Sequence, residues 1–222
     1  MRIPPLCRML AFLLTLVAFG DFARAQSPVG IFDAQTDVGR GRGAAGSASY
    51  DAQHQAYLVA GSGQNMWDTR DDFHFVWKRI HGNFILSTRA RFISAGVEEH
   101  RKIGWTIRPS LEASSAHVSA ALHGNGLMSL QFRRQTGAIT EEARSADSLP
   151  DADAIIQLER RDSVFLMSVA RFGDTLVTQQ LAGVSLPDTV YVGLFVCAHY
   201  DTLVDRATFS NVRITIPAKP DF

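Results

Sequence analysis

The sequence predicts an all-β fold in which two antiparallel sheets pack as a sandwich. Phe73, Phe75 and Trp77 recur at every second residue, as in a β-strand with one buried face. Short apolar runs of strand length continue from Gln26 onward and are separated by turn residues. No segment shows a convincing amphipathic helical period. Many evenly spaced strands without helices are typical of a sandwich or barrel.

The expected strands follow one another as a meander. In the aromatic strand, the pattern predicts that Phe73, Phe75 and Trp77 point inward, while His74 and Lys78 take the opposite register. This strand closes at the turn His81-Gly82-Asn83. The other predicted strands are residues 30–38, 47–50, 56–60, 84–93, 103–108, 116–122, 127–134, 155–160, 164–172, 190–199 and 207–216.

Local signals refine this meander at four places. Asn125-Gly126 predicts a type I′ hairpin, which requires positive φ at both central residues. The change of parity near Ser210-Asn211 predicts a bulge in the last strand. Residues 39–46 form a glycine-rich loop. Residues 140–148 are the sole candidate for a short helical turn.

The first 25 residues have the features of a secretory signal peptide. Arg2 and Arg8 provide a positive start, residues 9–20 are apolar but too short for a membrane span, and Ala23-Arg24-Ala25 is a small-residue cleavage site. We therefore expect residues 26–222 to form a single domain with no later membrane span, located in the periplasm or secreted. A signal anchor remains the alternative.

Charge and cysteine content exclude several classes of function. Removing Arg2, Arg8, Arg24 and Asp21 from a balance of 22 basic and 22 acidic residues leaves a net charge of −2. A nucleic-acid partner, which requires a basic surface, is therefore not expected. Cys197 alone would remain after cleavage, and its apolar surroundings favour an inert buried thiol over a disulfide.

Several motifs together resemble one known family. They are Tyr57 to Gly63, Asn65-x-Trp67-x-x-x-Asp71-x-Phe73-x-Phe75-x-Trp77-Lys78, His100-Arg101-Lys102-x-Gly104-Trp105-x-x-Arg108-x-Ser110-Leu111, His123-Gly124-x-Gly126-Leu127 with Leu130 to Arg133, Leu158 to Arg160, Tyr191 to Cys197 and Phe209 to Arg213. The chain is similar to exported concanavalin A-like lectin/glucanase domains of unknown function that occur beside TolB-like β-propellers in bacterial envelope proteins. The resemblance covers nearly all of residues 26–222.

The resemblance implies a jelly-roll of two curved antiparallel sheets with a concave face suited to extended glycans. It also implies an envelope setting and a protein partner such as a TolB-like propeller. It supplies no catalytic pair, and no propeller repeats follow Phe222 in this sequence. Fold resemblance therefore supports architecture more than activity.

Known catalytic and cofactor patterns are weak in this sequence. The Glu-x-Asp-x-x-Glu run of glucanases in this superfamily is missing, and the acidic pairs 71–72, 98–99 and 141–142 would be split between the two faces of a strand. Gly41 to Gly46 matches a dinucleotide fingerprint but leads into a predicted strand instead of a helix. Histidine spacing fits no zinc motif, so neither a metal nor a cofactor is expected.

The remaining candidate is a binding face on neighbouring strands. Trp67 and Trp105 can stack on sugar rings, and the planar polar groups of Arg108, Gln131 and Arg133 can bind hydroxyl or carboxylate groups. Arg108 is out of phase with Ile103, Trp105 and Ile107, as Gln131 and Arg133 are with the apolar residues of their strand. Two alternatives stay open: Trp105 belongs to the core, and the arginines pair with Glu159 or Asp71. The predicted ligand-binding residues are Trp67, Asp71, His74, Trp105, Arg108, Gln131 and Arg133.

These observations favour an exported, non-catalytic, glycan-binding sandwich. His74 would join the arginines in hydrogen bonding to the glycan, although a structural histidine is the simpler interpretation. One alternative is a polysaccharide hydrolase or lyase that uses Asp71, Asp72 or His74 for acid-base chemistry. Another is an interaction module that docks a TolB-like propeller.

Overall fold

The computed structural model describes residues 28–39, 45–150 and 153–218, which form strands and turns with no helix among them. Within these ranges, therefore, no helix is long and apolar enough to cross a membrane. The chain forms two seven-stranded antiparallel sheets and one short two-stranded sheet. This confirms the predicted two-sheet antiparallel sandwich. The predicted leader, residues 1–25, and most of the fingerprint at Gly41 to Gly46 lie outside the described residues.

The first sheet carries the candidate site. Its strands, in spatial order, are β1 (Ala34–Val38), β6 (Phe73–His81), β15 (Thr189–Cys197), β8 (Lys102–Arg108), β9 (His117–His123), β10 (Leu127–Arg133) and β11 (Glu141–Ser148). The second sheet consists of β14 (Val177–Ala182), β13 (Val164–Arg171), β12 (Ala154–Arg161), β7 (Phe84–Phe92), β16 (Tyr200–Thr215), β3 (Ala56–Gly63) and β2 (Ser47–Asp51).

The main core lies between these two sheets. In the first sheet, Ile103, Trp105 and Ile107 of β8 face this core, and Leu86 of β7 and Phe165 of β13 contribute from the second sheet. Because side chains alternate along each strand, the residues of β8 between these three point to the opposite side of the first sheet. We call that side the outer face.

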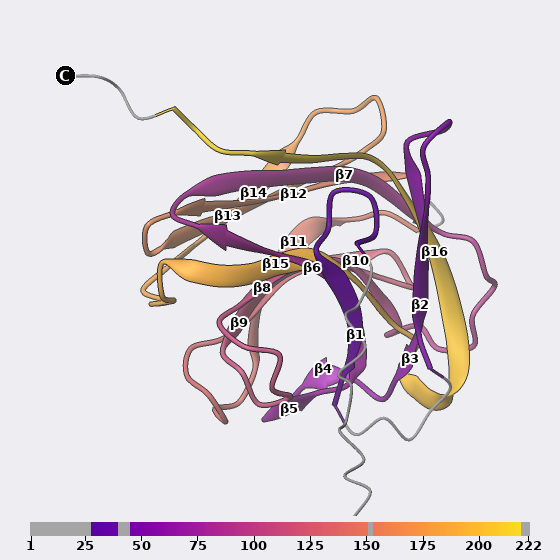
Figure 1. Ribbon diagram of the computed structural model, residues 1–222, viewed down its shortest axis with the longest axis horizontal. Helices are drawn as coiled ribbons and strands as arrows, with labels where there is room; N and C mark the ends of the chain where they lie inside the picture. Colours follow the sequence, from indigo (N-terminus) through magenta and orange to yellow (C-terminus); the bar gives the residue numbers. More distant parts are fainter. Residues whose placement is uncertain (1–27, 40–44, 151–152, 219–222) are drawn as a thin grey trace, which may run out of the picture.

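The short strands β4 (Met66–Trp67) and β5 (Arg70–Asp71) form a hairpin beside the outer face. In Figure 1 this hairpin lies at the bottom of the view, while β7, β12, β13 and β14 lie at the top, with β6, β8 and β15 between them. The backbone of Asp71 bonds to the carbonyl of Ala113, 2.8 Å away, which ties the hairpin to the loop that follows β8. The first sheet is therefore covered on both sides where the hairpin lies.

Most predicted strands are present, with a few corrections. Residues 141–148, near the predicted helical turn, form strand β11 and pair with β10. Strands β4, β5 and β14 were not predicted, and β16 begins at Tyr200 instead of Ala207. The predicted bulge is confirmed by a register shift between Ser210 and Arg213, with Asn211 at φ 51°.

The hairpin predicted at Asn125-Gly126 joins β9 and β10, as expected. Gly126 has φ 86°, whereas Asn125 is not among the described residues with positive φ. A type I′ turn requires positive φ at both positions, so the predicted turn type is wrong. The turn is instead closed by a bond from the backbone N–H of Gly126 to the carbonyl of His123, and the N–H of Asn125 donates to the carbonyl of Glu99 in the loop before β8.

Candidate functional site

Polar side chains from three adjacent strands gather on the outer face of the first sheet. Lys102, Thr106 and Arg108 of β8 point to this side, because their neighbours Ile103, Trp105 and Ile107 face the core. The pairing of β8 with β9 aligns Lys102 with His123 and Thr106 with Ser119. The prediction that Arg108, Gln131 and Arg133 share a face opposite the core residues is therefore correct.

The aromatic residues of β6 also lie on the outer face, contrary to the prediction. Phe73 and Phe75 belong to a second apolar cluster with Met66, Phe195 and Cys197, and Trp77 packs against it. Val76 and Ile80 of the same strand face the main core instead. Both faces of β6 are buried, one by the second sheet and one by the hairpin. A period of two identifies the strand but cannot show which of two buried faces meets the second sheet.

One half of the outer face is closed by the β4–β5 hairpin, and we call it the covered half. It contains Asp71 between two arginines. Arg108 Nη2 lies 3.2 Å from Asp71 Oδ2, and Arg133 Nη2 lies 2.8 Å from Asp71 Oδ1. All three side chains are fully buried.

Backbone oxygens satisfy much of the remaining hydrogen-bonding capacity of these arginines. Arg108 donates to the carbonyls of Ser110 at 2.8 Å and Glu112 at 2.6 Å. Arg133 donates to the carbonyl of Ser115 at 2.9 Å and to Thr140 Oγ1 at 3.0 Å. These bonds join β8, β10, the hairpin and two loops. The covered half therefore has the arrangement of a structural ion cluster, in agreement with the alternative in which the arginines pair with Asp71.

Burial governs protonation in the covered half. Desolvation lowers the pKa of Arg108 to about 10, although the negative charge of Asp71 acts in the opposite direction. Desolvation also lowers the pKa of His117 to about 4, against the nearby charge of Asp71 and together with those of Arg133 and Arg108. His117 is thus neutral near pH 7, and its Nδ1 lies 3.0 Å from Ser119 Oγ.

The other half of the outer face, which we call the open half, contains a pocket of about 340 Å³. Strands β8, β9 and β10 supply Lys102, His123 and Gln131, and Trp67 contributes from the hairpin. The full lining is Asn65, Trp67, His100, Lys102, His123, Asn125, Leu127, Gln131, Glu142, Arg144 and His199.

A chain of hydrogen bonds fixes the polar groups in this pocket. His123 Nδ1 lies 3.0 Å from the carbonyl of Leu127, so it carries the proton and donates there. The unprotonated Nε2 then accepts a bond of 3.3 Å from Gln131 Nε2. Desolvation, with a smaller contribution from the charge of Lys102, lowers the pKa of His123 to about 3. His123 is therefore a neutral residue that orients the amide of Gln131.

Among the described residues, one acceptor atom of this pocket, Gln131 Oε1, has no hydrogen-bond partner, and its side chain is almost fully buried. Ser129 Oγ on the same strand also has none, but Ser129 does not line the pocket. Nearby, Lys102 Nζ donates to Asn65 Oδ1, and the Lys102 side chain is also buried. Desolvation lowers the pKa of Lys102. Buried polar atoms without partners are uncommon in proteins, and they mark places where a polar ligand can bind.

The other predicted site residues lie apart from this pocket. Trp105 is buried in the core between the sheets, 6.2 Å from the ring of Phe32. His74 shares the parity of Val76, so it points away from the outer face, with Nδ1 2.7 Å from Asp37 Oδ1 and Nε2 3.1 Å from Gln35 Oε1. Of the seven predicted residues, only Trp67 and Gln131 line the open pocket.

Lys102 and His123 are among the pocket residues that the sequence interpretation missed. Lys102 has the same parity in its strand as Arg108, and this signal could have identified it. His123 ends β9 and lies opposite Lys102 in the pairing of β8 with β9. Neither signal shows which part of the face is open, because that depends on the position of the β4–β5 hairpin.

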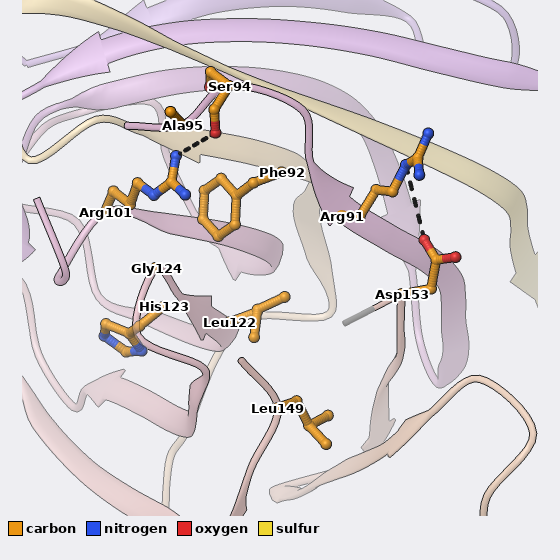
Figure 2. Close-up of a pocket in the computed structure, with 10 residues that line it drawn as sticks. All are labelled: Arg91, Phe92, Ser94, Ala95, Arg101, Leu122, His123, Gly124, Leu149 and Asp153. Atoms are coloured by element: carbon orange, nitrogen blue, oxygen red, sulfur yellow. Dashed lines mark hydrogen bonds and ion pairs between the residues drawn. The ribbon is translucent and has the colours of Figure 1, made fainter. Parts of the chain in front are cut away.

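A second cavity, of about 250 Å³, lies near the ends of β7 and β9. Figure 2 shows Arg101 turned toward the carbonyl of Ser94, with the ring of Phe92 beside it, and Arg91 turned toward Asp153. The guanidinium carbon of Arg101 lies 4.1 Å from the centre of the Phe92 ring, and Arg101 Nη1 pairs with Asp205 Oδ2 at 3.0 Å. In this second cavity, the charge of Arg101 is thus already neutralised by Asp205, unlike that of Lys102 in the open half.

Comparison with known proteins identifies the fold but no family. No protein-family model and no curated protein matches the sequence. A functionally unknown protein from Saccharomyces cerevisiae superposes with a TM-score of 0.62 at 16% identity, covering 78% of this chain and 93% of that chain. The carbohydrate binding module CBM66 from Bacillus subtilis gives 0.52 at 15% identity, covering 85% and 97%. The family 7 alginate lyase A1-II′ gives 0.51 at 10% identity, covering 76% and 82%.

These likenesses establish the fold of this chain as a jelly-roll sandwich of the concanavalin A-like type, as the resemblance implied. At identities this low they carry the fold alone. The predicted association with a TolB-like propeller stays a prediction.

Proposed function

We propose that this protein is an exported domain that binds a polysaccharide without cleaving it, in the open half of the outer face. The observation that carries the proposal is the pocket of about 340 Å³, in which buried Gln131 Oε1 has no hydrogen-bond partner among the described residues. Sugar hydroxyl groups donate and accept hydrogen bonds, and they match such an acceptor. A carbohydrate-binding module and alginate lyases with the same fold support this choice.

Trp67 is the aromatic residue of the pocket. It is half-buried on β4, so one part of the indole remains available at the rim. An exposed aromatic face next to oriented polar groups is the usual composition of a sugar site. Trp67 would therefore stack on a sugar ring, while Gln131 binds a hydroxyl group deeper in the pocket.

The catalytic alternative has less support from the geometry. It assigned acid-base chemistry to Asp71, Asp72 or His74. Asp71 is held between two buried arginines, Asp72 Oδ2 accepts a bond from the backbone of Gln64, and His74 points to the other side of the sheet. Asp71 and Asp72 line one pocket of about 440 Å³, but the carboxylate of Asp71 is held by the arginines and His74 lies outside this pocket. A glycoside-cleaving pair must instead face one bond. The polar lining of the open pocket also favours a glycan over an apolar protein-docking surface.

A binding assay with two pocket variants tests the proposal. Isothermal titration with a panel of soluble bacterial, algal and plant polysaccharides should give saturable binding for at least one of them. Trp67→Ala and Gln131→Leu should each weaken that binding about tenfold or more. Phe172→Ala, which changes an exposed aromatic residue after β13, is the matched control and should bind as the unaltered chain does. Absence of binding to the entire panel would overturn the proposal.

The same panel separates binding from cleavage. Each polysaccharide is incubated with the protein and assayed for new reducing ends and for the ultraviolet absorbance of unsaturated sugar ends. A binding module leaves both signals at the level of the buffer. Release of either product, abolished by Gln131→Leu, would replace the binding proposal with a hydrolase or a lyase.

A further inference from the structure

Lys102 is a buried cation that no acidic residue neutralises. Its side chain is 2% exposed, and among the described residues no carboxylate lies within 4.0 Å of its amine. The described partner of Lys102 Nζ is the neutral amide oxygen of Asn65. A buried charge is costly unless an opposite charge compensates it. An anion that enters the open pocket would supply this compensation.

The acidic side chains that could neutralise Lys102 already form ion pairs with arginines. Glu142 lines the same pocket, but its Oε1 pairs with Arg144 Nε at 2.5 Å. Asp71 lies in the covered half, between Arg108 and Arg133. Both carboxylates therefore have closer cations than Lys102. Lys102 and Arg144 give the pocket two positive charges, and Glu142 gives it one negative charge. The neutral His123 adds none, so the pocket has an excess of positive charge.

The groups beside Lys102 select for more than a simple anion. Gln131 Oε1 is a buried acceptor without a partner, and the bond from Gln131 Nε2 to His123 holds the amide in this orientation. An anion without a hydroxyl group, such as chloride or sulfate, has no proton to donate to this oxygen. A ligand with a hydroxyl group next to its negative charge satisfies Lys102 and Gln131 together.

We propose that the open pocket takes a sugar residue that carries a carboxylate, a hexuronic acid, with its carboxylate on Lys102 and a neighbouring hydroxyl group donating to Gln131 Oε1. This inference rests on the proposed glycan binding and adds the chemical class of the ligand. Trp67 at the rim contacts the sugar ring, and Arg144 contributes a second positive charge at the exposed edge of the pocket.

A matched pair of polysaccharides tests the carboxylate directly. Polygalacturonate, alginate and polyglucuronate are titrated into the full chain, each beside its carboxyl-reduced form, which keeps the backbone and loses the charge. At least one acidic form should bind, and its reduced form should bind at least tenfold more weakly. Poly-glutamate, which has carboxylates but no sugar hydroxyl groups, should not bind with comparable affinity.

Two substitutions of Lys102 locate the effect. Lys102→Met and Lys102→Gln should each reduce affinity for the acidic glycan at least tenfold while leaving affinity for the reduced form unchanged. Arg91→Ala, which removes an exposed arginine at the other cavity, should leave both affinities unchanged. Circular dichroism and thermal melting establish whether each variant is folded. If Lys102→Met does not fold, Lys102→Gln provides the test.

The outcomes separate this inference from the proposed function. Equal binding of an acidic glycan and its reduced form, or full binding by both Lys102 variants, overturns the carboxylate inference while glycan binding stands. Binding of poly-glutamate as strong as that of the glycan overturns it as well, because charge alone would then suffice. If neither acidic nor neutral glycans bind, the proposed function itself fails.

Discussion

The covered and open halves of the outer face use the same strands but treat buried charge in opposite ways. At one end of β8, Arg108 shares Asp71 with Arg133, and backbone oxygens accept further bonds from both arginines, although Arg108 Nη1 and Arg133 Nε have no partner among the described residues. At the other end, Lys102 is also buried, and its described hydrogen-bond partner is a neutral amide. Loss of Asp71 would leave two buried arginines without a carboxylate partner, whereas Lys102 already has none and costs stability unless a ligand supplies one. Under the proposed function, the two halves would separate structure from recognition along a single strand.

The largest expected effect is the loss of the carboxylate in the covered half. Asp71→Ala leaves two buried arginines without their counter-charge, and we expect the free energy of unfolding to fall by about 3–5 kcal/mol. Urea denaturation measures this change. The matched control is Glu141→Ala, which breaks an exposed pair with Arg134 and should cost less than about 1 kcal/mol. Similar losses in the two variants would contradict a structural role for the cluster.

Acid should destabilise the protein through the buried histidines of both halves. The pKa of His117 is lowered to about 4 and that of His123 to about 3. Below about pH 6.5 the unfolded chain protonates these imidazoles while the folded chain does not, so the unfolded state binds more protons. The stability that they contribute is complete above this pH and falls as the pH decreases toward 4, by on the order of 3 kcal/mol for each histidine.

Denaturation curves between pH 7 and pH 4.5 measure this loss. In His117→Gln the fall in unfolding free energy with decreasing pH should be shallower than in the unaltered chain, whatever the absolute stability of the variant. His54→Asn removes an exposed histidine and should leave the slope unchanged. An unchanged slope in His117→Gln would show that this imidazole is protonated to the same extent in both states.

Removal of the cation in the open half should act in the opposite direction to removal of Asp71. Lys102→Met replaces an uncompensated buried amine with an apolar chain of similar length, and we expect the free energy of unfolding to rise by about 1 kcal/mol. Urea denaturation of Lys102→Met and Arg133→Met, run side by side, sharpens the comparison, since Arg133→Met should be strongly destabilised. A large loss in both variants would show that the two halves are equally structural.

The smallest effect is expected at the exposed edge of the open half. The side chain of Arg144 is 68% exposed and pairs with Glu142. Arg144→Ala should therefore change the free energy of unfolding by less than about 1 kcal/mol. It should reduce the affinity for an acidic glycan by a few fold at most. Thermal melting and calorimetry provide the two values. A loss of affinity as large as that of Lys102→Met would place the main anion contact at the rim instead of at the floor.

The sequence predicted the architecture well because local patterns determine it. The alternation in β8 correctly placed Arg108 on the face opposite to Ile103, Trp105 and Ile107, which lie in the core. Trp105 had nevertheless been predicted as a ligand-binding residue, with a core position as the alternative. The parity change near Ser210 correctly indicated a bulge. Each of these features depends on a few consecutive residues, and the side-chain period of a strand is enough to identify it.

The site was less predictable because a non-local element decides it. Arg108 and Arg133 are on the predicted face, but the β4–β5 hairpin closes that part of the face and brings Asp71 between them. The same hairpin buries Phe73 and Phe75, whose alternation was assigned to the wrong side of the sheet. Strands of two residues leave little pattern in a sequence, so neither the hairpin nor the boundary that it creates could be foreseen.

Cys197, on β15 beneath the hairpin, gives the protein an internal reporter of opening. Its thiol is fully buried, and burial raises its pKa to about 11. Because alkylating reagents attack the thiolate, the folded chain should react extremely slowly. In a chain that carries Cys7→Ser, the rate of modification would then measure how often β15 and the hairpin separate, without any added dye or isotope.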